Sequence, residues 1–324
     1  MSDIKIIGLA FRYLNNVSLL PPRHNFGGEL GEVIFHSDPR VELQDGKRVS
    51  NVDAFIDLRT GAYMDGVESF HKRYYQHRRP SKQAQYFKLL EFNETQENPI
   101  LTAPRQFATW ADNRSDHEHP LDNYGILDCD EVVMKDQYGS SGCNHVVAPS
   151  HMVQSMLFNL TTKTGDEFAA AYPDVIISRG SNTDKPLFEK HSDITVTERI
   201  TNITKEWRLL FAGSKVYIRE REITPGDYSQ SNLCAEVIPT IPVVKYVPLH
   251  NYVDIPEEVV NAVYGLIHFV KLPFGSVDLY QTSDDQWGIF EYCEQFGFHG
   301  ADHKFIRQLH LDGIESILKE LFDI

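Results

Sequence analysis

The chain has 324 residues, of which 41% are hydrophobic and 24% are charged, and its formal net charge is −15. This length suits two or three domains with a large core, and the negative charge argues against a surface that coats nucleic acid. No apolar run approaches the roughly 20 residues that span a bilayer, and the N-terminus lacks the pattern of a secretory signal. The four cysteines lack the paired spacing of a structural zinc site, so we expect a reducing, cytoplasmic setting.

The first eighty residues predict a small α/β domain without a recognisable chemical motif. Apolar stretches at 4–9 and 52–58 are expected to form strands, and loops rich in Pro and Gly separate them. The basic and aromatic segment at 71–80 is interpreted as a solvated helix face with buried tyrosines. The alternative for this segment is a patch that binds phosphate or nucleic acid.

The pattern becomes regular from Ser81, which is suited to cap a helix that runs to Glu91. Further strands are expected at 131–135, 146–147, 174–177 and 194–200, hairpins at 206–222 and 276–293, and helices at 150–162, 256–270 and 313–322. Helices and strands that alternate with hairpins indicate an α+β fold, or an α/β fold with antiparallel pieces.

The first chemical motif is Lys135, followed by the loop Gly139-Ser140-Ser141-Gly142. A strand that leads from a lysine into a small, flexible loop can wrap phosphates, because glycines let backbone N–H groups approach an anion and serines add donors. The Gly-Lys-Ser/Thr sequence of a P-loop is absent. An ordinary connecting loop is the alternative.

The second motif is a predicted hairpin with Gly213-Ser214 as its loop. That loop sets Arg208 opposite Arg219, and it sets Glu206 opposite Arg221. The residues that alternate with these are mostly apolar and are expected to face the core. Clustered guanidinium groups form a good clamp for a polyphosphate or carboxylate. The alternative is a pair of strands that face solvent with incidental charges.

The third motif is an acid pair on the last predicted hairpin. If Asp284-Asp285 is a two-residue loop, Ser283 faces Gln286 and Asp278 faces Glu291. Opposed residues on one sheet face have Cβ atoms roughly 5 Å apart, and like charges placed in this way destabilise the sheet. We therefore expect a positive group between the two acids, and a divalent cation is the simplest candidate. The alternative is a register shifted by one residue, with both acids solvated.

The order of these motifs resembles the ATP-grasp family, from roughly Ser81 to the C-terminus. The family also has a lysine before a Gly-Ser loop, an acid-bearing strand, a Glu-x-Arg hairpin, and an Asp and a Glu on a terminal hairpin. The resemblance implies an α+β ATP-grasp fold, in which two subdomains enclose a nucleotide. It divides the chain into an N-terminal α/β domain at 1–80, a small lid subdomain at 81–200 and a large subdomain with the magnesium and phosphate site at 201–324.

The resemblance also implies the site residues. The first family lysine matches Lys82, with Lys88 as an alternative. The implied nucleotide-binding residues are Lys82, Lys135, Gly139, Ser140, Ser141, Gly142, Glu198, Arg199, Ile200 and Glu206. The implied metal ligands are Asp278, Glu291 and Glu294, and the implied catalytic residues are Arg208, Arg219 and Arg221.

One departure from the family lies at its terminal Glu-x-Asn, which reads Glu291-Tyr292-Cys293 in this chain. Cysteine is a poor ligand for magnesium, because hard cations prefer oxygen. Glu294 could supply the missing oxygen, but it should point to the other sheet face unless the strand bulges or ends there. Either metal binding survives through Glu294 or the site is partly degenerate.

The activity that the resemblance implies is an ATP- and Mg²⁺-dependent ligation. A carboxylate is activated as an acyl phosphate and is then attacked by an amine, as in peptide or amide bond formation. The expected partners are a small-molecule or peptide carboxylate, an amine and a second copy of the chain as a homodimer, without membrane or nucleic acid. Two alternatives stay open: an ATP-binding protein without turnover, which Cys293 favours, and a small-molecule kinase on the same fold.

Overall fold

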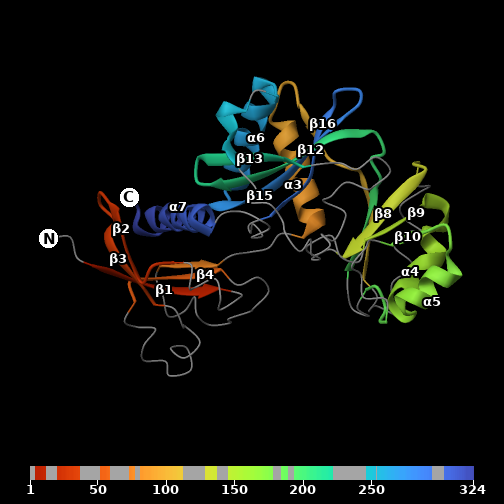
Figure 1. Cartoon of the computed structure of the whole chain (residues 1–324), viewed down its shortest axis with the longest axis horizontal. Helices are drawn as coiled ribbons and strands as arrows, with labels where there is room; N and C mark the ends of the chain where they lie inside the picture. Colours follow the sequence, from red (N-terminus) through yellow and green to blue (C-terminus); the bar gives the residue numbers. More distant parts are fainter. Residues whose placement is uncertain are drawn as a thin grey trace.

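The computed structural model describes residues 4–11, 20–36, 52–58, 73–76, 81–111, 128–136, 145–177, 184–188, 193–221, 246–252, 254–293 and 303–324. These residues form three sheets, which have five, five and six strands. Figure 1 shows the N-terminal sheet at one end of the molecule, a second five-stranded sheet at the other end, and the six-stranded sheet between them. No helix in the described part of the chain is long and apolar enough to cross a membrane.

The N-terminal sheet has the strand order β2-β3-β1-β4-β5 and is parallel except at β2. Its strands are β1 (Lys5–Phe11), β2 (Arg23–Gly27), β3 (Gly31–His36), β4 (Ala54–Leu58) and β5 (Tyr74–Gln76). The strands predicted at 4–9 and 52–58 are therefore confirmed. The helix predicted at 71–80 is wrong in its described part, because residues 74–76 pair with β4 as an edge strand.

The second five-stranded sheet is antiparallel and lies in the segment 81–200 that the resemblance assigns to the lid subdomain, so we call it the lid sheet. Its order is β10-β9-β8-β11-β7, and its strands are β7 (Gln106–Ala111), β8 (Glu131–Asp136), β9 (Val146–Pro149), β10 (Ile176–Ile177) and β11 (Asp193–Glu198). The helices α4 (Val153–Thr162) and α5 (Gly165–Ala171) cover one face and bury Met134 and Val196 there. Because side chains alternate along a strand, Lys135 and Thr197 lie on the opposite face.

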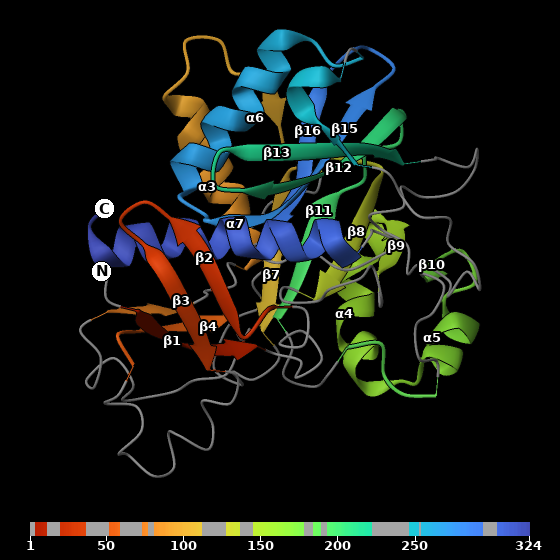
Figure 2. The same ribbon diagram turned by 60° about the vertical axis from the view of Figure 1, so that its left-hand side comes forward.

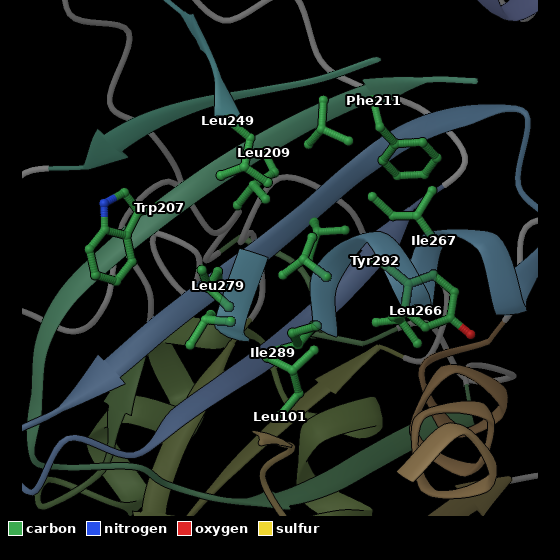
Figure 3. Close-up of a cluster of buried hydrophobic side chains, with 14 of the residues drawn as sticks. Leu101, Trp207, Leu209, Phe211, Leu249, Leu266, Ile267, Leu279, Ile289 and Tyr292 are labelled. Carbon is green, nitrogen blue, oxygen red and sulfur yellow. The ribbon is translucent and has the colours of Figure 1, made fainter. Parts of the chain in front are cut away.

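The six-stranded sheet has the order β14-β13-β12-β15-β16-β6. Its strands are β6 (Leu101–Thr102), β12 (Ile203–Ala212), β13 (Lys215–Arg221), β14 (Val247–Pro248), β15 (Phe274–Thr282) and β16 (Trp287–Cys293). The helices α3 (Lys82–Glu94) and α6 (Glu257–Val270) pack on one face, where Trp207, Leu266 and Tyr292 belong to one buried cluster (Figure 3). Although α3 and β6 lie in the segment 81–200 that was predicted as the lid subdomain, both pack with this sheet.

The last helix, α7 (His303–Phe322), joins the six-stranded sheet to the N-terminal sheet. Leu210 and Phe274 from the six-stranded sheet share a buried cluster with Ile314 of α7 and with Ile7 and Val33 of the N-terminal sheet. Figure 2 shows α7 running between these two sheets. The sequence predicted only the second half of this helix, from residue 313.

Helix α7 approaches the sheet closely at Gly313. A Cβ atom built at this glycine would lie 2.6 Å from Cδ1 of Phe274, which is shorter than a van der Waals contact. Phe274 is itself buried, so its ring has little room to move. The absence of a side chain at Gly313 therefore lets the helix and the sheet meet.

We expect Gly313→Ala to destabilise the protein by about 1–3 kcal/mol, because the overpacking against Phe274 exceeds the gain in helix propensity. Gly265→Ala in α6 is the matched control. There the added Cβ would lie 3.2 Å from the nearest atom of Phe92, so we expect a smaller loss. Urea unfolding of both variants measures the difference, and a Gly313→Ala protein as stable as the wild type would contradict this account of the contact.

Candidate functional site

The hairpin formed by β12 and β13 has the register that the sequence predicted. Glu206 is paired with Arg221 and Arg208 with Arg219, and the turn residue Gly213 has a φ of 56°. Only glycine and a few other residues adopt this conformation readily, and the two-residue turn depends on it. The backbone of β13 therefore places Arg219 and Arg221 on the face that carries Arg208.

The hairpin formed by β15 and β16 also pairs Asp278 with Glu291, as predicted. The tip differs from the prediction, because Thr282 rather than Ser283 is bonded to Gln286, through an N···O distance of 2.9 Å. The loop thus has three residues and ends at Asp285, whose φ is 61°.

A β-bulge restores the predicted pairing. Leu279 pairs with Ile289 whereas Asp278 pairs with Glu291, so Phe290 has no residue opposite it. The loop has one residue more than predicted, which shifts the register of the two strands by one residue, and the unpaired Phe290 shifts the register back by one. As a result, Asp278 and Glu291 face one another although the tip was predicted incorrectly.

Basic side chains supply the positive charge that the two acids require. Arg208 donates to a carboxylate oxygen of Asp278 at 3.2 Å and to the hydroxyl of Ser276 at 3.0 Å. Nζ of Lys82 lies 3.6 Å from Oε2 of Glu291. Lys82 is only 5% exposed, so these pairs are desolvated and interact more strongly than surface pairs do.

The lid subdomain adds a further cation, Lys135, to the same cluster. Burial lowers the pKa of Lys135 to about 8, and the positive charge of Lys82 contributes, whereas Glu291 and Asp278 act in the opposite direction. The structure therefore brings Lys82, Lys135, Arg208, Asp278 and Glu291 together from five different elements.

Glu291 is held ionised by this cluster. Burial by itself favours the protonated carboxyl, but Lys82, Lys135, Arg208 and His145 outweigh it and hold the pKa of Glu291 at about 2. A carboxylate that stays charged at neutral pH can bind a cation. It can equally hold the two lysines in place until an anion enters.

A narrow pocket lies at this cluster, between the lid sheet and the six-stranded sheet. It is lined by both lysines, by Glu291, by Thr197 of β11 and by Tyr86 of α3. Its enclosed volume is about 20 Å³, which is enough for roughly one water molecule. A molecule larger than water would fit there only if the two sheets or their side chains separated.

Besides Glu206, three of the predicted nucleotide-binding residues lie outside the lining of this pocket. Glu198 forms an ion pair with Arg105 at 2.8 Å, and Arg199 forms one with Glu131 at 2.6 Å. Ile200 follows them and is half-buried. All three lie where β11 leaves the lid sheet, one residue or more beyond Thr197.

Some predicted residues fall outside the part of the chain that the structure describes. These are Gly139, Ser140, Ser141, Gly142 and Glu294. Arg221 is described by its backbone pairing alone. Glu206, by contrast, is described and is buried beside Arg208 in β12.

Cys293 lies beside the acids on β16, where it pairs with Ser276. Burial raises the pKa of its thiol to about 12, and the charge of Glu291 adds to this effect. The side chain is therefore a neutral thiol at physiological pH, which offers little to a hard cation. Within the described residues, no group of three or more His, Cys, Asp or Glu side chains could hold a metal ion.

The two carboxylates still fit magnesium. Mg²⁺ is commonly held by one or two carboxylates, with water and substrate phosphates in its remaining positions. Asp278 and Glu291 are hard oxygen donors that face one another, so they could hold the ion once their paired cations have moved to a ligand.

Gln85 is a site residue that the sequence analysis missed. It lies one helical turn after Lys82, is 7% exposed, and accepts a hydrogen bond from the backbone N–H of Tyr292 at 3.1 Å. The buried face of α3 consists of Lys82, Gln85, Leu89 and Phe92. This site residue could have been predicted from the sequence. The spacing of three, four and three residues places polar Gln85 on the same helix face as Lys82.

No protein-family model matches the sequence, and none of the curated proteins matches it. Among solved structures, the chain is similar to the VanG D-Ala:D-Ser ligase of Enterococcus faecalis, with a TM-score of 0.51 and 12% identity over 97% of this chain and 100% of that one. It is also similar to the biotin carboxylase of Campylobacter jejuni, with a TM-score of 0.51 and 8% identity over 99% and 71% of the two chains. These similarities confirm the α+β ATP-grasp fold.

We expect Lys135→Met to stabilise the protein by about 1–3 kcal/mol at pH 7, because the variant no longer buries a charge. Below pH 8 the lysine is charged in both the folded and the unfolded chain, and its burial cost is felt in full. Between pH 8 and 10.5 the folded chain loses the proton first, so wild-type stability rises with pH relative to the variant.

Urea unfolding of both proteins from pH 7 to 9 measures this difference. Lys185→Met, at an exposed lysine of the lid subdomain, is the control and should leave the pH profile unchanged. A Lys135→Met protein that is less stable than the wild type at pH 7 would show that attraction to the acids outweighs desolvation.

Proposed function

We propose that this chain is an ATP- and Mg²⁺-dependent ligase that activates a carboxylate as an acyl phosphate for attack by an amine. The observation that supports this most directly is the convergence of three cations and two carboxylates at the pocket between the lid and the six-stranded sheet. Phosphoryl transfer needs mainly positioning and neutralisation of charge, and these residues can provide both.

The cations are assigned to the phosphates. Lys82 and Lys135 would hold the ATP phosphates, with Gly139 to Gly142 closing over them. Arg208, Arg219 and Arg221 would stabilise the transferring phosphoryl group and the acyl phosphate. For the adenosine we retain Glu198, Arg199, Ile200 and Glu206, which lie around the exit of β11 and the start of β12.

The carboxylates are assigned to the metal. Asp278 and Glu291 would hold Mg²⁺, with Glu294 as a further ligand. The ion, when bound, would neutralise the negative charge of the phosphate oxygens. The carboxylate and amine substrates would be small molecules or peptides, and a homodimer is the proposed assembly.

The ion pairs of the site favour a binding order in which the nucleotide precedes the metal. Asp278 is paired with Arg208 and Glu291 with Lys82, so a metal that binds alone competes with buried basic side chains. Phosphates attract the same cations. Their arrival would release both acids for the metal.

This order predicts that Lys82→Met raises the Mn²⁺ affinity of the nucleotide-free protein by about 5- to 10-fold, because a unit charge next to Glu291 is removed. Electron paramagnetic resonance of free Mn²⁺ measures the affinity directly. Lys88→Met is the control, since Lys88 is on the same helix and pairs with Glu91 in solvent. Unchanged or weaker Mn²⁺ binding in Lys82→Met would argue against competition between lysine and metal.

The function itself is tested by thermal unfolding with a non-hydrolysable ATP analogue, with and without Mg²⁺. A ligand at 100 times its Kd stabilises a protein by about 2.7 kcal/mol, so the wild type should show a clear shift that increases with Mg²⁺. Asp278→Asn should lose the magnesium-dependent part. Asp285→Asn, the same change at the exposed tip of the same hairpin, should retain it. The absence of any shift in the wild type would refute nucleotide binding.

Turnover distinguishes the ligase from its alternatives. ADP formation that requires both a carboxylate and an amine supports the ligase, whereas ADP formation without an amine supports a kinase. Nucleotide binding without turnover on a panel of carboxylates and amines would favour the ATP-binding protein without catalysis, which the neutral thiol of Cys293 supports.

A further inference from the structure

Helix α3 is attached to the outer edge of the six-stranded sheet at two points. Near its start, Oε1 of Gln85 accepts the hydrogen bond from the N–H of Tyr292 in β16. Near its end, Nδ2 of Asn93 donates to the carbonyl of Leu101 in β6 at 2.7 Å. Both contacts join a side-chain amide to the backbone of an edge segment, but only the first lies beside the acids.

The backbone of β16 needs this contact because of how the strand is paired. In the part of the chain that the structure describes, β6 pairs with β16 only at Trp287 and Gly288. Beyond these two residues comes the bulge at Phe290, after which the strand resumes its pairing with β15. Gln85 thus takes the place of a neighbouring strand at Tyr292, directly after the bulge.

The same contact determines where Glu291 points. A slip of one residue in a strand turns each side chain to the opposite face. The bulge at Phe290 disrupts the ladder next to Glu291, so pairing with β15 holds the strand less firmly there. The hydrogen bond to Tyr292 opposes that slip one residue from Glu291. Lys82, one turn earlier on the same helix face, holds the Glu291 carboxylate itself.

We propose that Gln85 is a positioning residue for the metal site: its hydrogen bond to Tyr292 keeps the Glu291 carboxylate directed at Asp278. This rests on the proposed function, because it assigns Glu291 to the metal. Gln85 acts through the backbone of β16 and has no contact of its own with the metal. Its loss should therefore affect metal-dependent binding and spare the attraction between the lysines and the phosphates.

The test compares Gln85→Met with Asn93→Leu. Each variant removes one amide that ties α3 to the edge of the sheet, so the two should lose similar amounts of stability. For each protein, the affinity for ATP is measured by calorimetry in EDTA and again with Mn²⁺. Because Gln85 also lines the pocket, each affinity with Mn²⁺ is divided by the affinity of the same protein in EDTA. We expect Gln85→Met to lose about 10- to 100-fold of this gain from Mn²⁺, as is typical for residues that orient metal ligands.

Other results of the same measurements would overturn the proposal for Gln85. A Gln85→Met protein that retains the full gain from Mn²⁺, or an Asn93→Leu protein that loses as much of it, would overturn a positioning role for Gln85. Gln85→Asn is a second variant in case the methionine is not tolerated. Its amide is one methylene shorter and cannot reach Tyr292 from the same helix position, so it should lose the gain too.

Failure of the proposed function gives a different result. A wild-type protein that does not bind ATP refutes the nucleotide site, whereas one that binds ATP in EDTA without any gain from Mn²⁺ refutes the metal assignment and with it the role of Gln85. A wild type with a metal-dependent gain leaves the proposed function standing, and the inference alone is refuted if Gln85→Met keeps that gain or Asn93→Leu loses as much of it.

Discussion

The site depends on one electrostatic constraint, namely that two carboxylates on neighbouring strands face each other within a buried region. Asp278 and Glu291 cannot both stay ionised there unless positive charge surrounds them. The fold meets this requirement with cations from three separate places: Arg208 from the adjoining strand, Lys82 from α3 and Lys135 from the lid sheet. The same attraction that allows the acids to be buried therefore also ties α3 to the central sheet, whereas for Lys135 of the lid sheet the cost of burial exceeds the attraction to the acids.

The central strand β12 shows how one segment serves both the core and the site. On one face Trp207 and its alternating neighbours are buried under α3 and α6. The other face is polar at one end of the strand and apolar at the other. Arg208 belongs to the charged cluster and buried Glu206 lies two residues before it, whereas Leu210 and Ala212 pack with α7. The apolar end anchors the N-terminal sheet, and its rigidity benefits the polar end, because a site built on strands is held more precisely than one on loops.

Much of the site could be predicted from the sequence, because strand pairing follows simple arithmetic once a turn is located. The pairs between β12 and β13 came directly from the Gly213-Ser214 turn. The bulge at Phe290 could not be foreseen, since nothing in the local sequence marks an extra residue in a strand of aromatic and aliphatic side chains. The packing of α3 against β16 could not be predicted either. The helix precedes the strand by roughly two hundred residues, and no local pattern encodes such a contact.

Because of the bulge, the number of residues in the hairpin tip and the pairing of the two acids depend on different registers. Pairing next to the tip follows one register and pairing next to the acids follows another, with Phe290 taking up the difference. Residues inserted at the solvent-facing tip of Ser283 to Asp285 would therefore lengthen the loop without moving Asp278 or Glu291. Deleting Phe290 alone would remove the unpaired residue and leave Leu279 opposite Ile289 and Asp278 opposite Glu291. In evolutionary terms, this hairpin can change in length at its tip and at the bulge while the two acids stay opposite each other.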